Sequence, residues 1–130
     1  DMLRTGYPQE FLAAVYTTSD VLLGASYGEG FGVPVVEAQA CGTRVITSGF
    51  AATEDLAGPE SFVVGGQPFW DEMQSSFFMV PFVQSIQDAL KLAYAEPRGV
   101  SQSSIDFAKQ FDNAKVWNEK WLPFWTERFT

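Results

Sequence analysis

The sequence predicts an α/β fold: a partial doubly wound domain with a parallel sheet of about four strands, helices on both faces and a kinked carboxy-terminal helix. Short apolar segments alternate with segments of helical periodicity along the 130 residues, which is the order that parallel strand–helix units require. A complete doubly wound domain has about six strands, and the chain begins with Asp1 rather than Met. We therefore interpret the chain as a piece of a longer protein.

The first elements alternate as this fold requires. Residues 2–5 are predicted to end a strand, and residues 9–18 carry apolar side chains at helical spacing. The run at 21–25 is apolar throughout, which predicts a strand buried on both faces. Further short strands are predicted at 45–47 and 62–64.

A loop with three glycines joins the strand at 21–25 to the next helix. Pro34 suits the first position of that helix, where its missing N–H is not needed. Gly42 is predicted to end the helix in a left-handed conformation. Cys41, the one cysteine of the chain, is expected to be a small buried side chain on this helix.

Residues 67–79 are too apolar for an ordinary exposed loop. We favour a loop packed under the final helices, and the alternative is a flap near the ligand crevice. Pro81 is predicted to open the next helix, and Pro97 with Gly99 to end it. The buried stripe of that helix is expected to comprise Val83, Ile86, Leu90, Ala93 and Tyr94.

Two more helices are predicted at the carboxyl end. One begins near Ser101, and the other spans residues 112–130, with Asp112 as its N-cap and a kink at Pro123. We favour core packing for the aromatic stripe of the last helix, and the alternative is an exposed patch that meets another domain or a second copy. The stripe comprises Trp117, Trp121, Phe124, Trp125 and Phe129.

Composition excludes several classes of function. The formal net charge of −8 argues against nucleic acid or an anionic membrane surface as the main partner. No apolar run reaches the roughly 18 residues of a transmembrane segment, and no secretory signal opens the chain. The chain has no His and one Cys, which excludes a Ser-His-Asp triad, a His-ligated metal and a cysteine cluster for zinc. One unpaired thiol fits a reducing, cytoplasmic location.

The glycine loop, residues 26–33, follows a predicted strand, and in open α/β sheets ligands bind at that end of the strands. The N–H groups of Phe31, Gly32 and Val33 at the helix start favour an anion such as a phosphate. The glycine spacing differs from that of a dinucleotide fingerprint or a P-loop, so a tight turn without a ligand is the alternative. Glycines, which let the backbone approach a ligand, stand at Gly28, Gly30 and Gly32.

Glu29 and Glu37 favour a sugar or ribose as the ligand. An ionised carboxylate accepts hydrogen bonds at several lone pairs, which suits vicinal hydroxyl groups. Glu37 is expected about one turn into the helix, on or near the same side as Glu29. The alternatives are a solvated loop charge with compensation of the helix dipole, or a glycosidase acid/base pair, which we discount because Glu37 faces back toward a nucleotide position.

The segment from Ser19 to Ile46 resembles the carboxy-terminal domain of retaining GT-B glycosyltransferases. It is similar to the glycosyltransferase group 1 family in Ser26-Tyr27-Gly28-Glu29-Gly30-Phe31-Gly32-Val33-Pro34-Val35-Val36-Glu37, which contains that family's E-x7-E pattern. Residues 11–16 are also similar to the family's helix before the strand. The similarity covers most of residues 3–65.

The resemblance implies a Rossmann-like donor-binding domain, one of two in a metal-independent hexosyltransferase. Its substrate is a nucleotide-sugar, with no cofactor, and the sugar is transferred to an acceptor with retention. Glu29 would be the catalytic residue and would bind hydroxyls of the transferred sugar, while Glu37 would bind the ribose. The nucleotide base would lie by Thr5, Gly6 and Tyr7. The rest of the donor site would be formed by Gly28, Gly30, Phe31, Gly32 and Val33.

The resemblance also implies parts that this chain does not contain. The basic residues that meet the diphosphate and the amino-terminal domain with its acceptor site lie upstream, so we expect the chain alone to be inactive. That domain is the expected partner, and it would bring any peripheral membrane association. Arg44 is expected at the wrong end of the sheet for a ligand. The alternatives are a non-catalytic nucleotide- or phospho-ligand-binding α/β module and a structural half-domain with a vestigial site.

Overall fold

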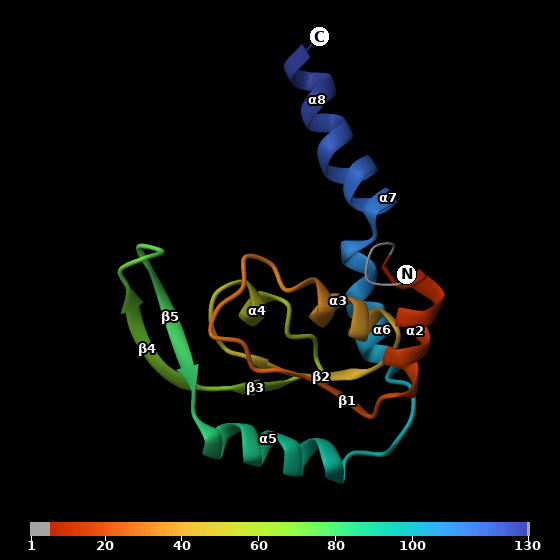
Figure 1. The fold of residues 1–130 in the computed structure, drawn as a ribbon. Helices are drawn as coiled ribbons and strands as arrows, with labels where there is room; N and C mark the ends of the chain where they lie inside the picture. The colour runs from red at the N-terminus through yellow and green to blue at the C-terminus, as the bar shows by residue number, and fades with distance from the viewer. Residues whose placement is uncertain (1–5, 130) are drawn as a thin grey trace.

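The computed structural model describes residues 6–129. Within them, a three-stranded parallel sheet lies between helices on both faces (Figure 1). The strands are adjacent in chain order, and Leu22 pairs with Val45 while Ile46 pairs with Phe62. The predicted α/β fold with a parallel sheet is confirmed, whereas the strand predicted at 2–5 falls outside the described residues. The strands are β1 (Val21–Gly24), β2 (Arg44–Ser48) and β3 (Phe62–Val64).

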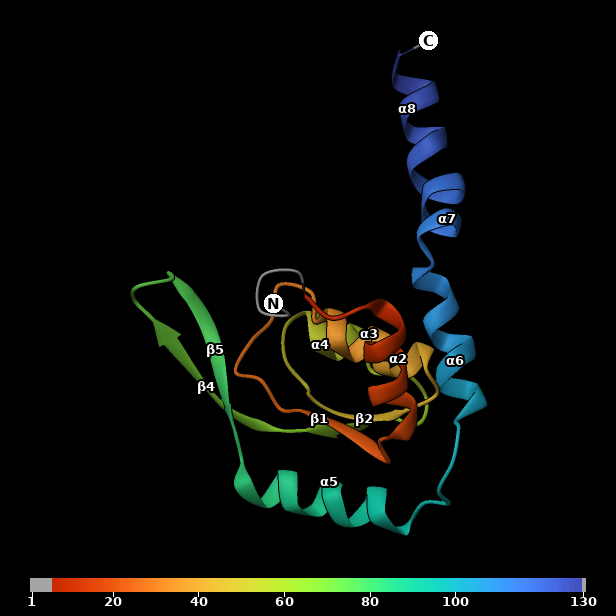
Figure 2. The same ribbon diagram turned by 45° about the vertical axis from the view of Figure 1, so that its right-hand side comes forward.

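Helices cover both faces of the sheet, and more of them lie on one face than on the other (Figures 1 and 2). The predicted helix ends are confirmed at Gly42, which has φ of 78°, and at Ser101, whose side chain accepts a hydrogen bond from the Ser104 N–H. None of the helices in residues 6–129 combines the length and apolar character needed to cross a membrane. The first face carries α2 (Gln9–Thr18), α3 (Val33–Ala40), α4 (Ala52–Asp55) and α6 (Gln102–Ala108), which continues into a 3₁₀ turn, Lys109–Phe111; the second carries α5 (Val83–Ala95).

Side chains alternate between two cores, one on each face of the sheet. Val45 packs with Val35 of α3, and Ile46 packs with Ala89 of α5. The prediction that β1 is buried on both faces is wrong at Leu23, which is 50% exposed. The reason is that α5 packs mainly on β2 and β3, leaving part of β1 uncovered.

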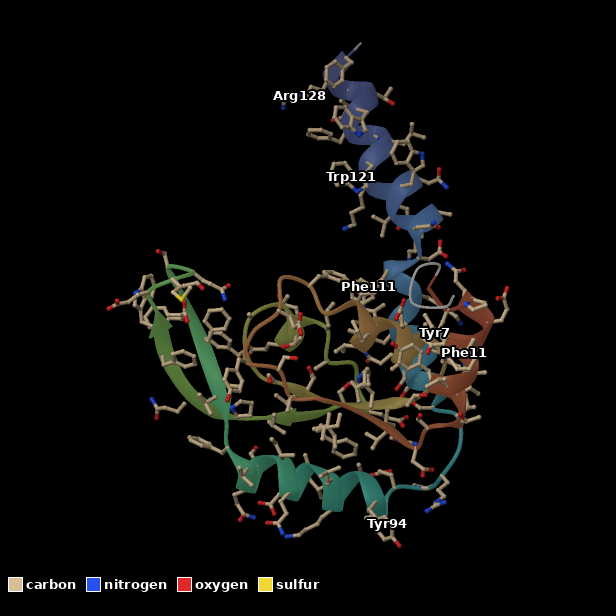
Figure 3. All side chains as sticks on the ribbon, viewed as in Figure 1. Tyr7, Phe11, Tyr94, Phe111, Trp121 and Arg128 are labelled. Atoms are coloured by element: carbon tan, nitrogen blue, oxygen red, sulfur yellow. The ribbon has the colours of Figure 1, made fainter. Side chains whose placement is uncertain are left out.

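The buried stripe of α5 is narrower and shorter than the sequence predicts, and Val83, Leu90 and Tyr94 are outside it. Val83 is 81% exposed and Tyr94 is 83% exposed, and Figure 3 shows Tyr94 pointing away from the body. A helix of 13 residues is about 20 Å long, whereas the three residues of β3 span about 10 Å. Val83 therefore extends past the sheet, while α5 packs through one face, formed by Ile86, Ala89 and Ala93, from which Tyr94 turns away.

Residues 67–79, which the sequence analysis interprets as a loop or a flap, lie in an antiparallel hairpin of β4 (Gly66–Asp71) and β5 (Ser76–Pro81). The favoured expectation, a loop packed under the final helices, is wrong. The hairpin lies on the opposite side of the molecule from the last helices, as both ribbon views show (Figures 1 and 2). It reaches the glycine loop instead, because the Met79 N–H donates to the Tyr27 carbonyl at 2.8 Å.

The carboxy-terminal helices project away from the sheet as one rod (Figure 1). They are α7 (Asn113–Val116), a π-helical segment (Trp117–Trp121) and α8 (Leu122–Phe129). Asp112 caps the rod as predicted, since its carboxylate accepts the Lys115 N–H at 2.9 Å. Pro123 cannot donate a backbone hydrogen bond, and the wide turn comes just before it, where the Leu122 N–H donates to the Trp117 carbonyl.

The aromatic stripe of this rod is exposed, so the favoured expectation of core packing is wrong. Its rings are between 42% and 72% exposed and contact mainly one another. The Arg128 guanidinium lies 5.7 Å from the centre of the Phe124 ring, and Figure 3 shows Trp121 and Arg128 well clear of the body. The rod begins directly after the 3₁₀ turn that ends at Phe111 and projects away from the body of the molecule, so its rings do not pack into either hydrophobic core.

An ion pair ties the amino-terminal end of β2 to three later segments. Arg44 Nη2 lies 2.8 Å from Glu60 Oε2, and Arg44 Nη1 donates to the Pro97 carbonyl at 3.1 Å. Ser103 Oγ donates to Glu60 Oε1 at 2.5 Å. This hydrogen bond, with the Arg44 charge, lowers the pKa of Glu60 below its ordinary 4.5.

Replacing Glu60 by Gln is expected to lower thermal stability near neutral pH and to have less effect in acid. A lowered pKa in the folded state stabilises the fold above the ordinary pKa, and this is lost as the pH falls through the folded value. Because Glu60 is partly exposed, the effect should be under about 1 kcal/mol. Melting temperatures measured between pH 3 and 7 test this. Ser103→Ala removes one hydrogen bond to Glu60, so its pH dependence should lie between those of the wild type and Glu60→Gln. Identical pH profiles for the wild type and Glu60→Gln would contradict it.

Candidate functional site

The glycine loop leaves the carboxyl end of β1 and is fixed to the loop that leaves β2. Ser48 Oγ donates to the Ser26 carbonyl at 2.5 Å. Thr53 Oγ1 is in contact with the Ser48 carbonyl at 2.9 Å and the Phe50 carbonyl at 2.8 Å. These hydroxyls are buried, so the loop is held in place by satisfied polar groups rather than by packing alone.

The three glycines of the loop have different surroundings. Gly32, the residue before α3, has φ of 100°, and a Cβ there would lie 3.0 Å from Thr53 Cγ2. At Gly28 a Cβ would lie 3.1 Å from a ring carbon of Phe78. At Gly30 it would meet nothing within 4 Å. Glycine is thus favoured by conformation at position 32, a side chain at position 28 would be in tight contact with Phe78, and position 30 is open.

Gly32→Ala is expected to destabilise the chain by about 1–3 kcal/mol, because alanine is strained at this φ. Gly30→Ala is the matched control, since it adds the same methyl group into open space. Chemical denaturation followed by far-UV circular dichroism measures both. Equal stability of the two variants would contradict the assigned difference.

Glu29 lies at a hollow between the glycine loop and the hairpin. The hollow has a volume of about 310 Å³, at the lower end of the range of ligand pockets. Glu29 is exposed, and its carboxylate has no hydrogen-bond partner in the described part of the chain. The residues that line the hollow are Gly28, Glu29, Gly30, Ala51, Gln74, Ser76, Phe77 and Phe78.

Ala51, on the rim of this hollow, has φ of 55° and ψ of −145°. This backbone conformation is costly for a residue with a side chain, and such strain is found preferentially at functional sites. Nothing in the sequence singles out Ala51, because its strain arises from how the short loop 49–51 joins β2 to α4.

Glu37 lies at a different hollow, between α2 and α3. The Tyr16 hydroxyl donates to Glu37 Oε2 at 3.0 Å. Burial, followed by the hydrogen bond to Glu37, raises the pKa of the Tyr16 phenol. The structure therefore gives Glu37 a partner that sequence reasoning missed and places the two carboxylates at separate hollows. The second hollow is lined by Gln9, Leu12, Ala13, Tyr16, Glu37, Ala40 and the half-buried Cys41.

The predicted phosphate-binding amides are unpaired. In residues 6–129, the N–H groups of Phe31, Gly32 and Val33 meet no acceptor. The Phe31 ring meets the edge of the Phe111 ring, with 6.1 Å between centroids. Three backbone N–H groups at the start of α3 therefore have no acceptor within the described residues, and Gly32 among them is buried.

Of the residues predicted to lie by a base, Thr5 falls outside the described residues. Gly6 has φ of 72°, and Tyr7 stacks on Phe11 with 4.8 Å between ring centroids (Figure 3). Within residues 6–129 no cluster of three or more His, Cys, Asp or Glu side chains is placed to hold a metal ion.

Gln39 is a buried positioning residue that the sequence analysis missed. Its Nε2 donates to the carbonyls of Val35 at 2.9 Å and Leu56 at 2.8 Å, and its Oε1 accepts the Gly58 N–H at 3.0 Å. These bonds attach the segment after α4 to α3, the helix that begins at the glycine loop. The available signal in the sequence was a polar residue, Gln39, between two alanines in a mostly apolar helix.

The first half of the chain matches a known protein family. Residues 4–67 match the family model described as "Glycosyl transferases group 1". The match includes the glycine loop, Glu29 and Glu37, and it ends near the start of β4.

Curated proteins from several bacteria are similar to the chain. The O-antigen chain mannosyltransferase B of Escherichia coli is 31% identical over 107 residues, 82% of this chain and 25% of that protein. The D-inositol 3-phosphate glycosyltransferase of Mycobacteroides abscessus is 31% identical over 106 residues, 79% of this chain and 21% of that protein. A protein of that name from Rhodococcus erythropolis is 54% identical over 39 residues, 30% of this chain and 9% of that protein. The chain thus spans about a quarter or less of the length of these relatives.

Proposed function

The chain belongs to the glycosyl transferases group 1 family, and on that premise we propose that it is the nucleotide-sugar-binding part of a retaining GT-B hexosyltransferase. The observation that carries the proposal is the glycine loop at the carboxyl end of β1. It combines unpaired N–H groups at the start of α3 with an unpaired carboxylate, Glu29, at the adjoining hollow. Amides suit a diphosphate and a carboxylate suits sugar hydroxyls.

In this proposal each part of the loop has one role. Glu29 is the catalytic residue and binds hydroxyls of the transferred sugar. The N–H groups of Phe31, Gly32 and Val33 bind the diphosphate. Glu37 accepts hydrogen bonds from the ribose, which requires it to share or give up the bond from Tyr16. Gly6 and Tyr7 lie by the base, and the reaction uses no metal.

The proposed whole enzyme needs a second, amino-terminal domain. That domain supplies the acceptor site and the positive charge for the diphosphate, so the chain alone binds the donor without transferring sugar. The enzyme works in the cytoplasm, and the amino-terminal domain sets any contact with membranes. The exposed rings of residues 112–130 are the surface that meets that domain, and in its absence they pair with a second copy.

The proposal is tested by ligand-observed NMR of the chain with UDP, GDP, ADP and dTDP. We expect weak binding, with Kd on the order of 1 mM, and a preference for one nucleotide. Glu37→Ala should weaken that binding about tenfold, because a hydrogen bond to a charged group is worth about 1.5–3 kcal/mol. Glu10→Ala, an exposed glutamate on α2, is the control.

Each outcome discriminates between functions. Selective binding that depends on Glu37 supports the donor-binding role. Equal binding of all four nucleotides, unchanged in Glu37→Ala, supports a non-catalytic phospho-ligand module instead. If the folded chain binds none of them and the full-length protein also binds none, the proposed function is wrong.

A further inference from the structure

The hairpin of β4 and β5 forms one wall of the Glu29 hollow. The match to the family model ends at residue 67, so nearly the whole hairpin lies beyond it. Half of the lining residues nevertheless come from the hairpin: Gln74, Ser76, Phe77 and Phe78. The family's motif thus supplies one side of the hollow and a segment outside the family model supplies the other.

The hairpin is fixed against the glycine loop at several points. The Met79 N–H donates to the Tyr27 carbonyl at 2.8 Å, and the Tyr27 ring meets the Phe69 ring edge-on at 6.3 Å. At the base of the hairpin, Gly66 is so close to β5 that a Cβ would lie 2.3 Å from the Val80 carbonyl oxygen. One backbone hydrogen bond and one ring contact therefore position this wall relative to the glycine loop, and tight packing at Gly66 holds the two strands of the hairpin together.

The face that the hairpin turns to the loop combines an aromatic ring with uncommitted polar groups. Phe78 lies against Gly28, and Ser76 shares its face of β5 because side chains alternate along a strand. Over the described residues, the Ser76 hydroxyl and the Gln74 side-chain amide have no hydrogen-bond partner. On the opposite face Trp70 pairs with Phe77, with 5.1 Å between ring centroids; Phe77 also reaches the edge of the hollow, whereas Trp70 does not line it.

We infer that Phe78, Ser76 and Gln74 form a subsite for a pyranose ring opposite Glu29, and that this hairpin determines which sugar the chain accepts. The inference rests on the proposed function and deepens it. A pyranose has an apolar face of C–H groups, which suits an aromatic ring, and a rim of hydroxyls, which suits a carboxylate, a hydroxyl and an amide. A phosphate would have no use for either the ring or Glu29.

The experiment compares the Kd of nucleotide-sugars with that of their nucleoside diphosphates, using UDP-glucose with UDP and GDP-mannose with GDP. Binding of methyl α-D-glucopyranoside and methyl α-D-mannopyranoside by saturation-transfer NMR is the second measurement. The variants are Phe78→Leu, which keeps an apolar side chain against Gly28, and Ser76→Ala. The matched control is Trp70→Leu, which removes an aromatic ring from the opposite face of the same hairpin.

We expect one nucleotide-sugar to bind about fivefold more tightly than its nucleoside diphosphate, since an aromatic contact contributes a factor of about 2–10. Phe78→Leu and Ser76→Ala should remove most of that ratio, and Trp70→Leu should retain it. An unchanged ratio in both test variants overturns the subsite and leaves the proposed function intact. Methyl hexosides that bind in a Phe78-dependent way, while neither the chain nor the full-length protein binds a nucleotide, overturn the proposed function and support the subsite. Absence of both kinds of binding in the chain and in the full-length protein overturns both.

Discussion

Replacing Glu29 by Gln is expected to lower the rate of sugar transfer by the full-length protein about 10²–10³-fold, the usual loss when one group that stabilises a transition state is removed. The substitution keeps the size of the side chain and removes its charge. Glu29 is exposed and has no partner in the described residues, so the fold should be unaffected. The expected change therefore lies in catalysis and not in stability.

Steady-state kinetics of Glu29→Gln separate its role from that of Glu37. A group that acts mainly in the transition state lowers kcat and kcat/KM together, whereas loss of a donor-binding contact raises KM for the nucleotide-sugar. We expect the first pattern for Glu29→Gln and the second for Glu37→Gln. Glu10→Gln, on the outer side of the molecule, is the control. A kcat within about threefold of the wild type for Glu29→Gln would remove Glu29 from the catalytic role.

Replacing Gln39 by Leu is expected to cost about 3 kcal/mol of the free energy of unfolding. Leucine has a similar volume but leaves the Leu56 carbonyl and the Gly58 N–H buried without their partner, and each such group costs about 1–3 kcal/mol. This is a large part of the 5–15 kcal/mol by which a domain is usually stable. The segment after α4 should detach from α3 before the sheet unfolds.

Urea denaturation followed by far-UV circular dichroism measures this effect. Gln110→Leu is the matched control, because the Gln110 side chain makes one exposed hydrogen bond, to the Phe107 carbonyl at 3.0 Å. The control should change stability by less than about 0.5 kcal/mol. A loss in Gln39→Leu no larger than that of the control would show that the buried hydrogen bonds do not hold the fold.

The elements predicted correctly are those that short-range signals determine. The apolar segments that became β2 and β3, the left-handed Gly42 and the N-cap Asp112 each depend on neighbours within a few residues. The glycine loop was placed correctly at the end of β1 for the same reason. Residues 19–46, which resemble the group 1 glycosyltransferases in sequence, lie within residues 4–67, the segment that matches the family model.

The errors concern how segments meet in space. The hairpin was missed because Phe69 and Phe78 stack only once β4 and β5 are paired. The sequence predicts Val83 and Tyr94 of α5 to be core residues because helical periodicity reports neither how far the sheet beneath extends nor how wide the covered face of the helix is. The separate hollows of Glu29 and Glu37, the partner Tyr16 and the strain at Ala51 likewise depend on how loops and helices pack.

The location of the tryptophans decides what an optical experiment on this chain reports. One of the four tryptophans, Trp70, is on the hairpin and the other three are on the projecting rod; none lies in the sheet or in the helices that cover it. Tryptophan fluorescence therefore reports directly on the surroundings of the hairpin and the rod, and only indirectly on the β1–β3 core. A variant with all three rod tryptophans replaced by phenylalanine would retain one tryptophan, Trp70, as a single-site reporter for the hairpin.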